Sequence, residues 1–184
     1  MSKLIIRRAT PDDASKVALL TRKAMLTYRD ASGISGNVLE SLTETDESVR
    51  ARIEAGRCLC VFQKDEVVGT ITITRCKNPI RYSFSEKTEQ FLSQYSSCGY
   101  ISRFAVKDEL RKSGLGGKLM DAALASRECT ETGLVLLHTA IANKGMKIFY
   151  YNRGFDLIDS ESSRGYERGL FAYERPFIES DIQE

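Results

Sequence analysis

The stretch that decides the fold is Tyr100-Ile-Ser-Arg-Phe-Ala-Val-Lys-Asp-Glu-Leu-Arg-Lys-Ser-Gly-Leu-Gly-Gly-Lys-Leu-Met120. Its apolar beginning predicts a strand, and the helix-forming residues from Leu115 onward predict a helix. Between them, Gly114 and Gly116 remove side chains where a ligand would approach the backbone. The amides at the start of the helix are unpaired and carry the positive end of its dipole. This arrangement of strand, turn and helix predicts a pyrophosphate site.

Two common nucleotide motifs do not fit this turn. A dinucleotide fold needs a third glycine where Leu119 stands, and a phosphate-binding loop of the NTPase type needs Ser or Thr after Lys118. Lys118 itself is expected to face solvent.

The pattern Arg-x-x-Gly-x-Gly after a strand resembles the coenzyme A loop of the GNAT superfamily of N-acetyltransferases. Further along, Asn143 and the run Phe149-Tyr-Tyr-Asn-Arg-Gly-Phe155 resemble the second signature of that family. The Thr10-Pro-Asp-Asp13 start of the first helix is also typical of it. The resemblance extends from about Leu4 to Glu174, with the 77–97 segment as an outlier.

The resemblance implies an α+β fold, in which helices flank a mixed, mostly antiparallel sheet of about seven strands. The fourth and fifth strands are expected to splay apart. Hydrophobic periodicity and turn residues independently predict strands near 4–9, 58–63, 67–75, 99–106, 134–141, 155–160 and 167–174, and helices that include 114–127 and 143–152. One domain is expected over 1–184, with a longer insertion over 77–97, which carries a short helix near 86–94, and a tail over 176–184.

The resemblance also assigns roles to residues. The backbone of Phe104, Ala105 and Val106 is expected to pair with the pantetheine arm, and the Val106 amide to polarise the thioester carbonyl. The pyrophosphate is expected to be wrapped mainly by main-chain amides of the loop residues Arg111, Lys112, Ser113, Gly114, Leu115, Gly116 and Gly117.

Asn143 is expected to contact the pantetheine, to cap the helix that follows, or to do both. Tyr150 matches the family tyrosine that donates a proton to the coenzyme A thiolate. Many relatives carry a glutamate base where this chain has Ser102, which leaves the base unassigned. Either water deprotonates the amine, or an acid comes from elsewhere, with Glu40, Glu44, Glu47 and Glu167 as candidates.

The acceptor pocket of the family is built by the first two helices and the last hairpin. In this chain the helical part, 28–46, is mildly acidic towards its end. The hairpin instead carries Arg164 and Arg168, which suit an acceptor that bears a carboxylate. The acceptor amine therefore stays open, with a small molecule preferred over a protein or peptide.

Composition narrows the classes of partner. A net charge of +2 disfavours nucleic acid and membrane surfaces, and the chain lacks an apolar run of spanning length. Five cysteines without a Cys-x-x-Cys spacing predict free thiols and a cytoplasmic location, with Cys58 and Cys60 on one face of a strand. A single histidine, His138, argues against a metal site and is expected to be structural.

The sequence thus predicts an acetyl-coenzyme A-dependent N-acetyltransferase that works without a metal, in which the amine attacks the thioester directly in a ternary complex. The alternative is a non-catalytic acyl-coenzyme A sensor, and the missing glutamate at Ser102 keeps that alternative open. A homodimer is the habit of the family and is not inferred from these residues.

Overall fold

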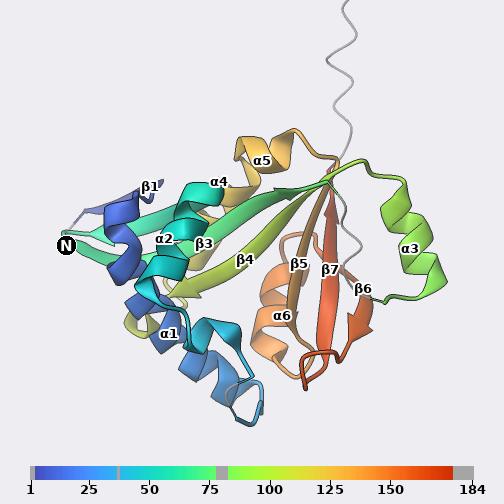
Figure 1. The fold of residues 1–184 in the computed structure, drawn as a ribbon, viewed down its shortest axis with the longest axis horizontal. Coiled ribbons are helices and arrows are strands. Elements are labelled where there is room, and N and C mark those ends of the chain that lie inside the picture. The colour runs from blue at the N-terminus through green and yellow to red at the C-terminus, as the bar shows by residue number, and fades with distance from the viewer. Residues whose placement is uncertain (1–2, 37, 78–82, 176–184) are drawn as a thin grey trace, which may run out of the picture.

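A seven-stranded sheet forms the middle of the computed structural model, which describes residues 3–36, 38–77 and 83–175 (Figure 1). The strand order is β1-β2-β3-β4-β5-β7-β6, and neighbouring strands are antiparallel except β4 and β5. This confirms the mixed, mostly antiparallel sheet that was predicted. The strands are β1 (Leu4–Arg8), β2 (Arg57–Gln63), β3 (Glu66–Cys76), β4 (Cys98–Val106), β5 (Leu134–Ala140), β6 (Asp156–Glu161) and β7 (Arg168–Glu174).

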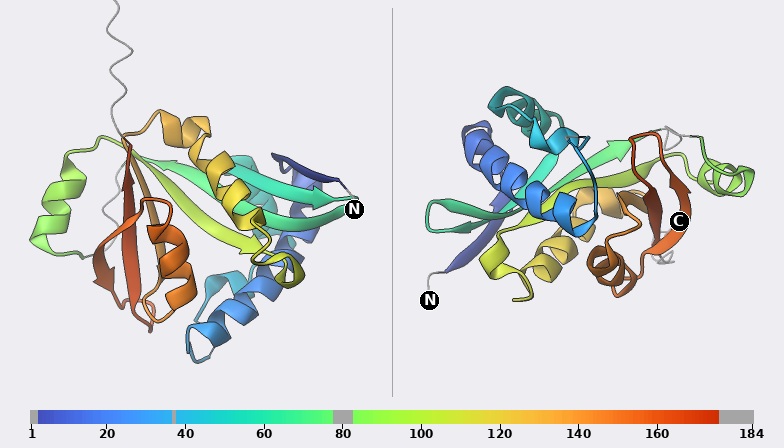
Figure 2. Two further views of the ribbon diagram at one scale, coloured as in Figure 1. Left: turned by 180° about the vertical axis from the view of Figure 1, so that it is seen from behind. Right: turned by 90° about the horizontal axis from the view of Figure 1, so that it is seen from below.

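Helices cover both faces of the sheet (Figure 2). The helices are η1 (Pro11–Asp13), α1 (Ala14–Ala31), η2 (Glu40–Leu42), α2 (Asp46–Ala55), α3 (Glu86–Ser93), η3 (Asp108–Leu110), α4 (Leu115–Leu124), α5 (Arg127–Thr130) and α6 (Lys144–Tyr151). On one face, α1 and α2 pack on β2 through a cluster that includes Cys58 and Cys60. On the other face, α4, α5 and α6 bury the residues between them, such as Val61. Successive side chains of β2 point to opposite faces of the sheet, so this strand contributes to two separate cores.

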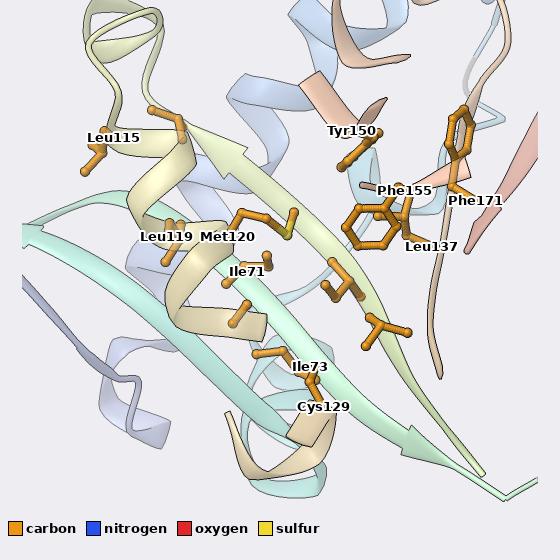
Figure 3. Close-up of a cluster of buried hydrophobic side chains, with 14 of the residues drawn as sticks. Ile71, Ile73, Leu115, Leu119, Met120, Cys129, Leu137, Tyr150, Phe155 and Phe171 are labelled. Carbon is orange, nitrogen blue, oxygen red and sulfur yellow. The ribbon is translucent and has the colours of Figure 1, made fainter. Parts of the chain in front are cut away.

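The larger core fixes α4 and α6 relative to the sheet. Leu119 and Met120 of α4 meet Ile71 of β3, and Tyr150 of α6 lies beside Phe155 and Phe171 (Figure 3). Because these side chains are almost fully buried, the beginning of α4 and the end of α6 are held rigidly near β4.

The predicted helix over 114–127 is shorter than expected. α4 ends at Leu124, and the separate α5 starts after Ser126. Ser126 has φ −70° and ψ 153°, an extended conformation that cannot continue a helix and instead precedes a new one. The 77–97 segment carries α3 near the predicted position. Residues 78–82 of that segment and the predicted tail 176–184 lie outside the described residues.

The middle of the sheet opens into a V. Three register pairs join β4 to β5, the last of them between Ile101 and Leu137, and beyond it the two strands separate (Figure 1). Just beyond Ile101, the pairing of β4 with β3 shifts by one residue. Two residues of β4, Arg103 and Phe104, lie opposite the single residue Ile71 of β3. Arg103 has φ +52°, so this β-bulge bends β4 away from β5. The predicted splay of the fourth and fifth strands is confirmed.

Candidate active site

A cavity of about 620 Å³ occupies the V. One end is lined by the glycine turn before α4. The other end is lined by α1, η2 and the β6–β7 hairpin, where Met25, Glu40, Arg164 and Tyr166 lie. Ser102 to Val106 of β4 line its length. One continuous space therefore joins the predicted phosphate turn to the predicted acceptor residues.

The glycine turn has an unusual backbone. Lys112 has φ +61° and Gly114 has φ +84°, both in the left-handed region. The amides of Gly116 and Gly117, at the first turn of α4, make no hydrogen bond to another described residue. Unpaired amides at the positive end of a helix dipole fit a phosphate group.

Most of the predicted loop residues line the cavity, but two do not. Arg111, Lys112, Gly114, Gly116 and Gly117 line it. The side chain of Leu115 instead points into the core, where the residue is 3% exposed. The Ser113 hydroxyl donates to the Leu110 carbonyl at 2.6 Å, so its side chain serves the turn itself.

The glycines at 116 and 117 make room for protein side chains. A Cβ at Gly116 would lie 3.3 Å from the ring of Phe104, and one at Gly117 would collide with the guanidinium of Arg153. Gly116 also lines the cavity, so the approach of a ligand to its backbone stays a prediction. Gly114 differs, because a Cβ at this position would have no atom within 4 Å and would project into open space.

Tyr150 lies on the cavity wall with its ring in the core. Its side chain is packed against the rings of Phe149, Phe155 and Phe171. Burial raises the pKa of Tyr150 well above its ordinary value, and the nearby phenols of Tyr28 and Tyr100 act in the same direction. The hydroxyl has no hydrogen-bond partner among the described residues, so it can donate to a group that enters the cavity.

Asn143 caps α6, as one of the two predicted roles requires. Its Oδ1 accepts from the Met146 amide at 3.1 Å, and its Nδ2 donates to the Ser32 hydroxyl at 3.1 Å. The side chain also lines the cavity, so contact with a coenzyme stays a prediction.

The acceptor end of the cavity is held together by ion pairs. Arg103 reaches Glu44 at 2.7 Å and Glu40 at 3.7 Å. Glu40 also pairs with Arg164, and Glu161 pairs with Arg168. Each of these three arginines therefore has a carboxylate partner.

Of the four candidate bases, only Glu40 lines the cavity. Glu44 is held between Arg103 and Arg52, and its side chain is 10% exposed. Glu47 and Glu167 are exposed at the surface and are not part of the wall.

His138 also lines this end, which the sequence did not indicate. Its Nδ1 lies 2.8 Å from the Tyr100 hydroxyl. Burial lowers the pKa of His138 to about 4, with the charge of Arg168 acting in the same direction and Glu161 opposing it. The ring is therefore neutral at pH 7.

The sequence profile of the Acetyltransferase (GNAT) family matches residues 25–155, which contain the glycine turn, Asn143 and Tyr150. The chain belongs to the GNAT acetyltransferase family. Membership implies acyl transfer as the class of reaction. No curated protein matches the sequence.

Several solved GNAT structures share the fold. One is the PaiA N-acetyltransferase from Thermoplasma acidophilum in complex with coenzyme A, with a TM-score of 0.70 and 15% identity over 94% of this chain and 99% of that one. Another is a GNAT acetyltransferase from Streptococcus pneumoniae, with a TM-score of 0.67 and 18% identity over 95% and 100%. An N-acetyltransferase from Staphylococcus aureus Mu50 has a TM-score of 0.66 and 14% identity over 94% and 98%. At these identities the likeness establishes the fold.

Membrane spans and metal clusters are both missing from the described part of the chain. No helix within residues 3–36, 38–77 and 83–175 has the length and apolar character to cross a membrane. In the same ranges, no three His, Cys, Asp or Glu side chains gather as a metal site would require.

Proposed function

We propose that this chain transfers the acetyl group of acetyl-coenzyme A to a primary amine of a small molecule, in a ternary complex. The observation that carries the proposal is one continuous cavity, which connects the unpaired amides of Gly116 and Gly117 to the hydroxyl of Tyr150 and to the acceptor end. When bound, acetyl-coenzyme A supplies an acyl group that is already activated as a thioester.

The residues of the chain position and polarise this group. The amides at the start of α4 hold the pyrophosphate, and the backbone of Phe104 to Val106 holds the pantetheine arm. The Val106 amide donates to the thioester oxygen. As the amine nitrogen bonds to the acyl carbon, the carbon–sulfur bond breaks, and Tyr150 gives its proton to the departing sulfur.

The proton of the amine leaves through water. Ser102 lies on the wall where a carboxylate base would stand, and serine is a poor base at neutral pH. Glu40 is the one candidate carboxylate on the wall, but it is engaged with both Arg103 and Arg164. A water-mediated route therefore suits this acceptor end better than a direct carboxylate base.

Turnover assays test the proposal directly. Acetyl-coenzyme A is incubated with the protein and a panel of polyamines, amino acids, aminoglycosides and peptide N-termini, and thiol release is measured. We expect thiol release with at least one small amine, and calorimetric binding of acetyl-coenzyme A without any amine. Binding without turnover on every amine would favour the sensor alternative, and no binding at millimolar concentration would contradict both.

A further inference from the structure

Arg153 lies beside the glycine turn although it comes from the other signature of the chain. It follows α6, and its guanidinium carbon stacks 4.0 Å from the centroid of the Phe149 ring. The same guanidinium lies against Gly117 in the first turn of α4. Arg153 also lines the cavity. The end of α6 thus brings a cation to the unpaired amides of α4.

The local sequence leaves space for this arginine. A side chain at Gly117 would collide with the guanidinium, whereas glycine admits it. The ring of Phe149 is in turn stacked on Phe104 of β4, with centroids 5.3 Å apart. Phe104, Phe149 and Arg153 therefore form a stack along the start of α4, and the stack fixes the plane of the guanidinium.

The hydrogen-bonding capacity of Arg153 is only partly used. Its buried Nε has no hydrogen-bond partner among the described residues, and its Nη1 donates to the Phe149 carbonyl at a long 3.4 Å. Asp121 is 3.8 Å from Nε, and its side chain is 70% exposed. A weak, solvent-screened ion pair leaves the fork available to a stronger anion.

The other arginine near the turn is more fully engaged. Arg111 pairs with Asp108 at 2.7 Å and also donates to the Val106 carbonyl. The Arg111 guanidinium therefore interacts with groups of the loop to which it belongs. Of the two arginines that line this end of the cavity, Arg153 has the weaker carboxylate partner.

We propose that Arg153 binds the pyrophosphate of coenzyme A, opposite the amides of Gly116 and Gly117. This inference rests on the proposed function, since it assigns a residue to the same coenzyme site. A guanidinium presents two parallel donors that match two phosphate oxygens, and Phe149 holds those donors in the orientation that the site requires.

The test compares three ligands on the wild type and on Arg153→Met, by calorimetry for coenzyme A and 3′-dephospho-coenzyme A and by saturation-transfer NMR for pantetheine. We expect the variant to bind the first two about 10–100-fold more weakly, because charge-assisted hydrogen bonds are lost. Binding of pantetheine, which has no phosphate, should not change. Arg153→Lys keeps the charge without the fork and should recover part of the loss. Lys118→Met is the matched control, because Lys118 is an exposed cation on α4 that does not line the cavity.

Each other outcome overturns the proposal in a recognisable way. Equal affinity of the wild type and Arg153→Met for coenzyme A removes Arg153 from the site. A loss confined to coenzyme A, with 3′-dephospho-coenzyme A unaffected, assigns the contact to the 3′-phosphate. An equal loss for pantetheine shows that Arg153 only supports the packing of α6. If the wild type itself binds no coenzyme A, the proposed function fails, and this result is separate from any effect of the variant.

Discussion

Tyr150 is surrounded by aromatic rings, which decides how it can act. Burial raises its pKa, so the phenol is neutral throughout the physiological range. A thiolate released into the same apolar surroundings is also poorly solvated and is a stronger base than in water, which offsets the weakening of the phenol as an acid. Tyr150 therefore keeps its proton until the thiolate forms, and it is unsuited to serve as a base.

Replacing Tyr150 with Phe is expected to lower kcat about 100-fold, since the proton donor is lost while the ring remains. The Kd for coenzyme A should be nearly unchanged. Steady-state kinetics and calorimetry measure the two quantities. The control is Tyr151→Phe, because Tyr151 is 45% exposed and absent from the cavity wall. Unaltered turnover in Tyr150→Phe would remove this residue from the mechanism.

Asp13 provides a test of stability against pH. A hydrogen bond from Arg7 and further bonds from Thr10, opposed by burial, lower the pKa of Asp13 to about 2. A depressed folded-state pKa stabilises the protein above the unfolded value and loses that effect as pH falls through 2. Asp13→Asn should cost about 1–2 kcal/mol at pH 7, and its difference from wild type should shrink below about pH 4.

Urea unfolding between about pH 7 and pH 3 measures this effect. Asp12→Asn is the matched control on the same turn, because the Asp12 side chain is 98% exposed and its ion pair with Arg50 is 4.0 Å long. A pH-independent difference for Asp13→Asn would show that its carboxylate is not the source of the stabilisation.

Sequence motifs predicted those site residues that lie close together in the chain. The turn residues were predicted because glycine spacing reports backbone geometry. That spacing does not reveal which way a side chain points, so the inward direction of Leu115 and the local bond of Ser113 were not foreseen. Arg153 and His138 were missed because their approach to the cavity depends on tertiary packing. The one signal in the sequence was that Arg153 stands inside the second signature.

Strands and helices were predicted well where hydrophobic periodicity is strong, as in β5 and α6. The break between α4 and α5 was missed, because neither Ala125 nor Ser126 is a glycine or proline that would mark it, although Ser126 adopts the extended backbone of a helix N-cap. The splay of β4 and β5 was predicted by resemblance alone. Its local cause, the bulge at Arg103, has no recognisable signal in residue type.

The β6–β7 hairpin offers a test at this scale. A Cβ at Gly169 would lie 2.5 Å from Leu157, 2.7 Å from Ile141 and 2.9 Å from Phe171. Gly169→Ala is therefore expected to destabilise the fold by about 1–3 kcal/mol through overpacking. Chemical denaturation checks this, with Gly145→Ala as control, since a Cβ there would lie 3.7 Å from its nearest neighbour, the Asn143 Oδ1. Equal stability of the two variants would contradict the packing described for β7.

The whole molecule should respond to its coenzyme. Ligand at about one hundred times its Kd adds about 2.7 kcal/mol to the free energy of unfolding, and this corresponds to a rise in Tm of about 5–10 °C for a domain of this size. Acetyl-coenzyme A should produce this shift in differential scanning fluorimetry. ATP carries adenine and phosphates without the pantetheine arm and should produce a smaller one. Equal shifts for both ligands would mean that β4 contributes nothing to binding.

The three register pairs between β4 and β5 also have a mechanical meaning. Each half of the sheet, β1 to β4 and β5 to β7, keeps a longer ladder of its own, whereas the seam between them is short. The larger core bridges that seam, with Ile101 of β4 and Leu137 of β5 both inside it, so side-chain packing more than backbone pairing holds the two halves together. The cavity thus occupies a gap in the backbone ladder that side-chain packing keeps in place.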